Sequence, residues 1–345
     1  MVVATGAYGN IGDAVIRRRV ISWARGLGQM HVYVGNGDQE WLQQLNVESS
    51  ATLYSAKYKF RWLLLPLKKK KVRALVFDPG AIPLDRSALP AEFVYLILTL
   101  LVRIRGGVVI RPPRGVKQGY WLTVLFHRLG ARASNITLWR TRRSFDLIRV
   151  GEICPDTAFQ EPKHWRGIDD SDRRYLGISL RGKNALPSEA WFSLIQQIVG
   201  EHKLTPVVFA QVREDEERAA EIAKLLGSEH FVWGECTELD HEARLQGLYK
   251  RSSLIVSDRL HVLILGALTG AIPLEIVDVP SGKVREHFGQ IEVHDISFSV
   301  EEAVAIGANA IIDNALGSRD LIRRRIDRAS IDLDNVVKRV RSTIG

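Results

Sequence analysis

The chain has 345 residues, enough for two domains of ordinary size. Its composition, with 46% hydrophobic and 25% charged residues, excludes disordered and fibrous proteins. Two cysteines, Cys154 and Cys236, are too few for a disulfide framework, and no metal-ligand cluster surrounds them. The 48 Lys and Arg against 39 Asp and Glu give a net charge of +9, which indicates an anionic partner. Because no nucleic-acid-binding motif accompanies this charge, we do not expect nucleic acid to be that partner.

The sequence shows neither a secretory signal nor a membrane span. Residues 1–6 lack the basic and apolar regions of a signal peptide. The longest apolar run, residues 93–102, is about half the length needed to cross a bilayer. We therefore expect a cytoplasmic protein.

Residues 1–150 alternate short apolar runs with amphipathic segments. The runs predict strands at 2–5, 31–35, 73–77, 108–111 and 136–140. The amphipathic segments predict helices at 13–27, 38–45, 90–104 and 118–129. The segment 58–67 is helical or irregular, because Pro66 would kink a regular helix. Strands separated by helices in this way indicate parallel βαβ units.

Residues 154–172 interrupt this pattern with two prolines and several charges, and we interpret them as a linker. A second cycle follows, with strands predicted at 175–180, 206–210, 231–233, 254–257 and 272–276. Its helices are predicted at 188–199, 215–226, 241–249 and 260–268, and a basic amphipathic helix follows at 319–343.

These elements predict an α/β protein with two Rossmann-like, doubly wound domains in a glycosyltransferase-B-like arrangement. The expected domains are residues 1–160 and 161–310, followed by a C-terminal basic helical segment, 311–345. Ligands of open parallel sheets bind beyond the carboxyl ends of the strands, so we expect the site in the cleft between the domains.

A glycine-rich turn, residues 6–13, separates the first predicted strand from the first helix. Gly9 and Gly12 let the backbone approach a ligand, and the helix N-terminus offers N–H groups to an anion. The glycine spacing is not that of a dinucleotide-binding turn, so no redox cofactor is expected. Asp13 at the helix start is either a functional carboxylate or a helix cap.

Two arginines follow predicted strands of the second domain. Arg259 stands two residues before His261, at the start of a helix, and Arg181 follows the strand 175–180. Arginine binds phosphate or carboxylate in a bidentate manner, and histidine can deliver a proton near neutral pH. Both Arg259 and His261 can face one ligand only if Arg259 belongs to the loop. The alternative interpretations are a structural histidine and a surface arginine.

Together these segments resemble the polysaccharide pyruvyl transferase family. The resemblance rests on Gly-Asn-Ile-Gly-Asp at 9–13, Ser-Leu-Arg at 179–181 and Arg-Leu-His at 259–261, in this order along the chain. Two first-domain turns depart from the family pattern. Phe-Asp-Pro-Gly at 77–80 replaces a run of glycines, and Pro-Pro-Arg-Gly at 112–115 replaces a Gly-Pro turn.

The resemblance implies transfer of pyruvate from phosphoenolpyruvate to two hydroxyls of a sugar, as a cyclic ketal, without a cofactor or a metal. It implies donor binding by Arg181, Arg259, Leu260 and His261, with His261 as the general acid and Asp13 as the base. Further donor or acceptor contacts are implied for Gly9, Asn10, Gly12, Arg140, Gln211 and Lys283. The implied partners are phosphoenolpyruvate and a glycan acceptor, which in this family is often lipid-linked.

Two other functions fit the same features. A nucleotide-sugar glycosyltransferase of the same fold would also place arginine at the helix turn, to bind a diphosphate. A catalytically inactive glycan-binding relative would explain the altered first-domain turns.

The stretch 60–67 is aromatic and aliphatic, and the basic run Lys68–Lys71 with Arg73 follows it. Such a segment can rest its apolar side in the headgroup boundary while its lysines meet anionic lipid. We therefore expect peripheral contact with an anionic membrane, at its inner face. The alternative is that Trp62 and the leucines belong to the core.

Overall fold

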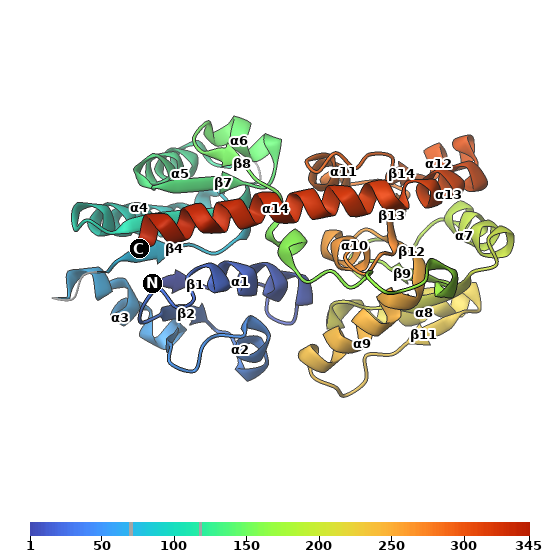
Figure 1. Ribbon diagram of the computed structural model, residues 1–345, viewed down its shortest axis with the longest axis horizontal. Coiled ribbons are helices and arrows are strands. Elements are labelled where there is room, and N and C mark those ends of the chain that lie inside the picture. The colour runs from blue at the N-terminus through green and yellow to red at the C-terminus, as the bar shows by residue number, and fades with distance from the viewer. Residues whose placement is uncertain (69–71, 117–118) are drawn as a thin grey trace. The chain divides into compact units, whose positions relative to one another are not determined.

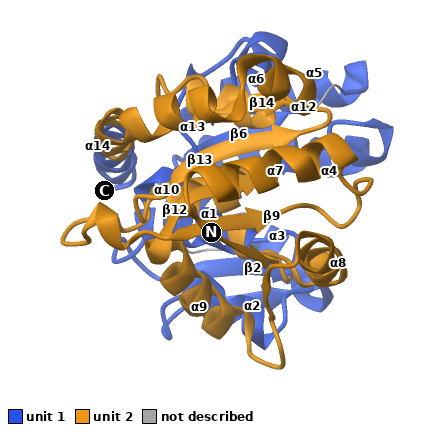
Figure 2. Ribbon diagram, turned by 90° about the vertical axis from the view of Figure 1, so that its right-hand side faces the viewer, with its two compact units in different colours: residues 1–8, 13–160, 331–345 blue, residues 9–12, 161–330 orange. Residues whose placement is uncertain are grey.

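A computed structural model describes residues 1–68, 72–116 and 119–345 (Figure 1). The described chain forms two compact units (Figure 2). Unit 1 comprises residues 1–8, 13–160 and 331–345, and unit 2 comprises residues 9–12 and 161–330. The predicted basic helix is therefore no separate domain, because α14 (Arg319–Ile344) contributes residues to both units.

Unit 1 is built on a parallel sheet with the strand order β3-β2-β1-β4-β6-β7-β8, and β5 pairs with the end of β6. The described strands are β1 (Val2–Val3), β2 (His31–Gly35), β3 (Thr52–Ser55), β4 (Ala74–Val76), β5 (Gly80–Ile82), β6 (Val108–Val116), β7 (Ile136–Trp139) and β8 (Glu152–Ile153). Its helices are α1 (Ile11–Trp23), α2 (Gln39–Leu45), α3 (Lys59–Leu63), α4 (Leu89–Ile104), α5 (Trp121–Ala133) and α6 (Arg142–Ile148).

Unit 2 has a parallel sheet with the order β11-β10-β9-β12-β13-β14. Its strands are β9 (Tyr175–Ser179), β10 (Thr205–Phe209), β11 (Glu229–Phe231), β12 (Ser252–Ser257), β13 (Ile272–Val277) and β14 (Ser297–Ser299). Its helices are α7 (Glu189–Glu201), α8 (Glu216–Leu226), α9 (Glu238–Arg251), α10 (Leu260–Ala267), α11 (Lys283–Gly289), α12 (Val300–Ile306) and α13 (Ala308–Gly317). The strand order reverses between β9 and β12, which is where a doubly wound sheet binds its ligands.

Local sequence explains where the helices of unit 2 begin and end. Ser188 and Thr237 precede α7 and α9, and each side chain accepts a hydrogen bond from a backbone N–H of the first turn. Gly227 ends α8 with a φ of 61°, a left-handed conformation that glycine adopts without strain. β12 is buried along its whole length, as expected for a strand covered on both faces.

The segment predicted to meet a membrane divides between core and surface. Trp62 and Leu65 are buried against α4 and β4, whereas Phe60, Leu64 and Leu67 are exposed. Residues 69–71 of the basic run lie outside the described residues. The segment itself consists of α3 and a short 3₁₀ turn, η2 (Leu65–Leu67), with Pro66 in the turn.

A buried hydrogen bond joins α4 to α5. The Nδ1 atom of His127 lies 2.8 Å from a carboxylate oxygen of Glu92, and both side chains are removed from solvent. Burial lowers the pKa of His127 to about 4, although the Glu92 carboxylate acts in the opposite direction. His127 is therefore neutral at pH 7 and donates its Nδ1 proton to Glu92.

We predict that the unfolding free energy falls as the pH drops from about 6.5 to about 4, because His127 takes up a proton only in the unfolded chain there. At about 1.4 kcal/mol per pKa unit the loss reaches about 3 kcal/mol. Urea unfolding between pH 7 and 4 measures it, and His127→Gln serves as the variant that does not titrate. An equally steep loss in both proteins would contradict the assignment.

Candidate functional site

The carboxyl ends of β9 and β12 lie side by side in unit 2, because Ser179 and Ser257 are partners in the parallel register. The Ser257 hydroxyl donates to the Ser179 carbonyl at 2.5 Å and accepts from the backbone N–H of Arg259 at 3.0 Å. These bonds fix the path of the chain where it leaves each strand. Arg181 and Arg259 therefore follow neighbouring strand ends. The sequence predicted that each of them follows a strand, and their role in donor binding stays a prediction.

Asp215 fixes the orientation of Arg259. Its buried carboxylate accepts a short hydrogen bond from Arg259 Nε and a second, at 2.9 Å, from the backbone N–H of Gly182. Arg259 is the N-cap of α10 and has an extended backbone, with φ −96° and ψ 112°. It belongs to the loop, which is the condition under which Arg259 and His261 can face one ligand.

Asp258 organises the loop after β9. Its carboxylate accepts from the backbone N–H of Arg181 at 3.0 Å and from the side-chain amide of Asn184 at 2.6 Å. Burial raises the pKa of Asp258 above its ordinary value, and the neighbouring Arg181 opposes that shift. Buried carboxyls with raised pKa values are more frequent at functional sites than elsewhere.

A cavity of about 510 Å³ opens beside these loops. Arg181, Lys183 and Asn184 line it from the loop after β9, and Trp191 lines it from α7. Asp258 lines it from just after β12, and Glu275 from within β13. Its volume lies within the range of small-molecule sites, which runs from roughly 300 to 1,000 Å³. It combines cationic, carboxylic and amide groups.

Glu275 is a carboxyl group in the middle of an otherwise apolar strand. Its side chain is 0% exposed, and Oε2 accepts from the Ser297 hydroxyl at 2.6 Å. Its other oxygen, Oε1, has no hydrogen-bond partner among the described residues. Burial raises the pKa of Glu275, and the nearby Asp258 carboxylate adds to the effect. A buried carboxyl without a full set of partners is costly for folding, so its presence in a cavity wall points to ligand binding.

His261 lies in the first turn of α10 and is mostly buried. A Cβ atom on Gly12, which counts with unit 2, would lie 2.4 Å from His261 Nδ1, so only glycine leaves room for the ring. Asn10 forms an isolated bridge to Val212, and Gly9 has a φ of 76°. Residues 9–12 of the glycine-rich turn and His261 are thus neighbours within one unit.

The other predicted site residues have different surroundings. Leu260 is buried, so its backbone is the part of it that can meet a ligand, and Gln211 is buried after β10. Lys283 is the half-buried first residue of α11. Arg140, in unit 1, forms an ion pair with Asp156 in which Nη1 and Oδ2 are 2.7 Å apart. Both partners of that pair are buried.

Asp13 belongs to unit 1, where it accepts from the backbone N–H of Ala7 at 2.9 Å and lies 3.5 Å from the guanidinium of Arg17. Arg17 also lies 3.8 Å from Asp78, and Asp78 pairs with Arg114 at 2.5 Å. Asp78 and Arg114 come from the two turns that depart from the family pattern. The two departures are therefore ion-pair partners, and they join a network that includes Asp13.

Asp258, Glu275 and Asn184 line the cavity but were not predicted from the sequence. Glu275 had a signal, because a single acidic residue stands inside the apolar strand Ile272–Val277. Asp258 directly follows a buried strand and precedes Arg259, a position that also faces the ligand end of a parallel sheet. Asn184 had no signal, because it is an exposed loop residue brought to the site by its bond to Asp258.

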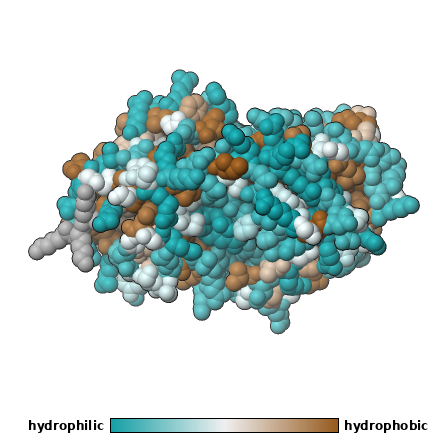
Figure 3. Space-filling model, viewed as in Figure 1, coloured by the Kyte–Doolittle hydropathy of each residue, from teal (hydrophilic) through white to brown (hydrophobic). Residues whose placement is uncertain are grey.

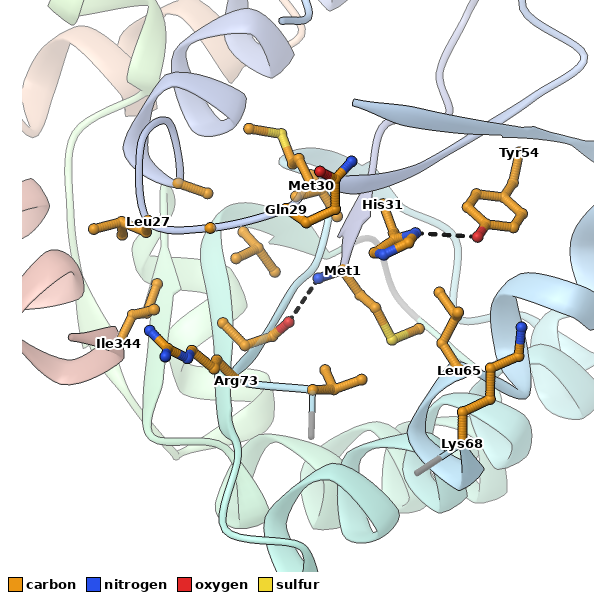
Figure 4. A pocket seen from close by; sticks show the side chains of 16 residues that line it. Met1, Leu27, Gln29, Met30, His31, Tyr54, Leu65, Lys68, Arg73 and Ile344 are labelled. Atoms are coloured by element: carbon orange, nitrogen blue, oxygen red, sulfur yellow. Dashed lines mark hydrogen bonds between the residues drawn. The ribbon is translucent and has the colours of Figure 1, made fainter. Parts of the chain in front are cut away.

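A larger cavity, of about 810 Å³, lies in unit 1 at the amino ends of β1, β2 and β4 (Figure 4). In it the Met1 amino group donates to the Ala74 carbonyl at 2.7 Å, and His31 Nδ1 lies 3.0 Å from the Tyr54 hydroxyl. These are the strand ends opposite to those where ligands of parallel sheets bind.

The described residues contain no group of three or more His, Cys, Asp or Glu side chains that could hold a metal ion.

No family model and no curated protein matches the sequence. Solved structures do match the fold. The chain is similar to Anabaena HepE, solved in complex with UDP and glucose, with 10% identity over 98% of this chain and 99% of that one and a TM-score of 0.57. It is also similar to the UDP-GlcNAc 2-epimerase of Neisseria meningitidis bound to UDP-GlcNAc, with 12% identity, coverage of 100% and 99%, and a TM-score of 0.55.

The predicted fold class is confirmed: the chain has two Rossmann-like α/β domains of the glycosyltransferase-B type. At these identities the likeness shows the fold and leaves the reaction open. The resemblance to polysaccharide pyruvyl transferases stays a prediction.

We predict that Glu275→Gln raises the unfolding free energy at pH 7, because burial penalises the ionised carboxylate and the amide carries no charge. Because the folded-state pKa of Glu275 is raised, the penalty grows as the pH rises above about 4.5 and is smallest below it. Chemical unfolding of both proteins at pH 4.5 and pH 7.5 measures the difference. A variant that is less stable than wild type at pH 7.5 would show that Glu275 has a structural role.

Proposed function

We propose that the protein is a transferase that binds a phosphate-bearing donor in unit 2, at the carboxyl ends of β9 and β12, and passes a group from it to a glycan hydroxyl. The observation that carries this proposal is the pair of arginines at adjacent strand ends, one of them oriented by Asp215. Guanidinium groups bind phosphate in a bidentate manner, and the N–H groups at the start of α10 add further donors.

The first donor we propose is a nucleotide sugar. HepE and the epimerase share the fold and were solved with UDP or a UDP-sugar. The 510 Å³ cavity beside Arg181 is larger than a phosphate group needs, and its carboxyl groups, Asp258 and Glu275, can accept hydrogen bonds from sugar hydroxyls. Arg181 would bind phosphate, and the cavity would receive the hydroxyl-bearing part of the donor.

The second donor is phosphoenolpyruvate, which the grouping of Arg181, Arg259 and His261 in one unit favours. A proton from His261 would convert the donor methylene into a methyl group and leave the adjacent carbon open to a sugar hydroxyl. Phosphate would leave, and a second hydroxyl would close the ketal. A role of Asp13 as the base that accepts the proton of an attacking hydroxyl stays a prediction from the sequence.

The acceptor in both cases is a hydroxyl of a sugar, with a lipid-linked glycan as one form of it. A cytoplasmic location remains a prediction from the sequence. A glycan-binding protein without catalysis would bind a donor and release neither UDP nor phosphate.

The test is calorimetric titration with UDP, UDP-GlcNAc, UDP-glucose and phosphoenolpyruvate, followed by assays for released UDP or phosphate with a panel of glycan acceptors. Binding of UDP compounds alone favours glycosyl transfer, and binding of phosphoenolpyruvate alone favours pyruvyl transfer. Failure of every phosphorylated ligand to bind would overturn the proposal.

We predict that Arg181→Ala and Arg259→Ala each weaken binding of whichever donor the titration identifies by at least about tenfold, since a charge-assisted pair contributes about 1.5–3 kcal/mol. Arg181→Ala should leave the melting temperature near that of wild type, because the Arg181 side chain is only half-buried. Arg259→Ala should lower it, because the buried Asp215 carboxylate loses its ion-pair partner. Arg166→Ala, which removes an exposed arginine of the same unit, is the matched control. Wild-type affinity in both site variants would place the donor elsewhere.

We predict that His261→Gln lowers turnover by about 10²-fold or more while donor affinity changes little, as expected for a group that acts in the transition state. Gly12→Ala should act in the same direction, because its new Cβ displaces the His261 ring. His164→Gln, in a loop of the same unit, is the control. If the loss appears wholly in donor affinity, His261 is a binding residue and another group moves the proton.

A further inference from the structure

Unit 1 exposes large apolar side chains on two helices that pack against each other. On α4 they are Phe93, Val94, Ile97, Leu100 and Ile104, and on α5 they are Trp121, Leu125 and Leu129. Ile104 is 81% exposed and Trp121 is 66% exposed. Figure 3 shows apolar side chains, in brown, on the part of the surface that lies over α4 in Figure 1. We call these eight residues, with Phe60, Leu64 and Leu67, the apolar face.

The apolar face is continuous across its elements. The rings of Phe93 on α4 and Phe126 on α5 lie 5.4 Å apart, so the exposed sides of the two helices adjoin. Beneath the surface, Trp62 and Leu65 pack in one cluster with Leu98 and Val102 of α4. The exposed Phe60, Leu64 and Leu67 belong to the same short segment as Trp62 and Leu65. Contiguous exposed apolar surface of this kind marks an interaction site.

The apolar face covers one side of α4 and leaves the other side in the core. The stretch Arg86–Ile104 is long and apolar enough to cross a membrane by length and composition alone. The buried side of α4, with Leu96, Leu98 and Val102, packs instead on the sheet and α5. If α4 lies in the plane of a membrane interface, its exposed side can meet lipid while its buried side keeps its contacts with the sheet. If α4 crossed the membrane, its buried side would lose those contacts.

The charges around the apolar face select its partner. The three helices α3, α4 and α5 contain one acidic residue, Glu92, and it is buried against His127. Exposed basic residues flank the face on every one of these elements: Lys59 and Arg61 on α3, Arg103 on α4, Arg105 just after α4, and Arg132 on α5. A symmetric dimer through this face would bring the same basic residues against each other, whereas an anionic surface complements them.

We propose that the apolar face docks unit 1 on an anionic lipid bilayer, with the exposed sides of α4 and α5 in the headgroup boundary and the flanking arginines against lipid phosphates. The inference rests on surface residues outside the donor site, and it holds whichever donor the protein uses. Docking of this kind would bring the protein to acceptors that are carried by lipids.

The test is cosedimentation of the full chain with vesicles of phosphatidylcholine alone or mixed with phosphatidylglycerol, in the absence of donor and acceptor. We expect binding to the anionic vesicles at low salt, less at high salt, and little to the neutral ones. The double variant Ile104→Asp/Trp121→Asp should lower the bound fraction at least about tenfold. Val304→Asp, which changes a similarly exposed apolar residue on α12 of unit 2, should bind as wild type does.

Two results would overturn the proposal. The first is wild-type protein that stays in the supernatant with anionic vesicles at low salt. The second is a lipid-free dimer in light scattering that Ile104→Asp/Trp121→Asp converts to monomer, which would show that a second copy covers the face. Because no substrate is present, neither result bears on the donor site, and equal melting temperatures of the variants exclude a folding defect.

Discussion

The ion pair between Asp215 and Arg259 is the interaction on which the candidate site depends. One carboxylate orients the Arg259 guanidinium and binds the backbone N–H of Gly182, so it joins the loops that follow β9, β10 and β12. Because the pair is largely removed from water, loss of the carboxylate would leave a charge with little compensation. The cationic end of the site is thus held in place before a ligand arrives, which lowers the entropy cost of binding.

The acidic groups of the site lower the stability of the fold. Asp258 and Glu275 stay buried although burial raises the pKa of each, and Glu275 keeps one oxygen without a partner in the described protein. A fold selected for stability alone would place an apolar side chain at the Glu275 position of β13. In unit 1, Asp78 and Arg114 stand in two turns that are far apart in the sequence, and they form an ion pair.

The sequence predicted much of the fold, because alternation of strand and helix patterns is a local property and parallel sheets have few topologies. It placed Arg181 and Arg259 after strands for the same reason, and residues after parallel strands share one edge of the sheet. Their role in donor binding stays a prediction. It did not predict the short strands β5 and β8, which depend on pairing with β6 and β7. Nor did it predict the apolar face: α4 is apolar on most of its circumference, so only packing decides which side meets water.

We propose that a phosphorylated donor binds unit 2 at the ends of β9 and β12. Hydrogen–deuterium exchange of the wild-type protein, with and without saturating UDP, UDP-GlcNAc or phosphoenolpyruvate, tests it most directly, because each peptide reports its own protection. We expect at least one of these ligands to protect the amides of residues 180–184 and 257–262 from exchange. Protection by a bound donor that is confined to unit 1, with those two segments unchanged, would contradict it.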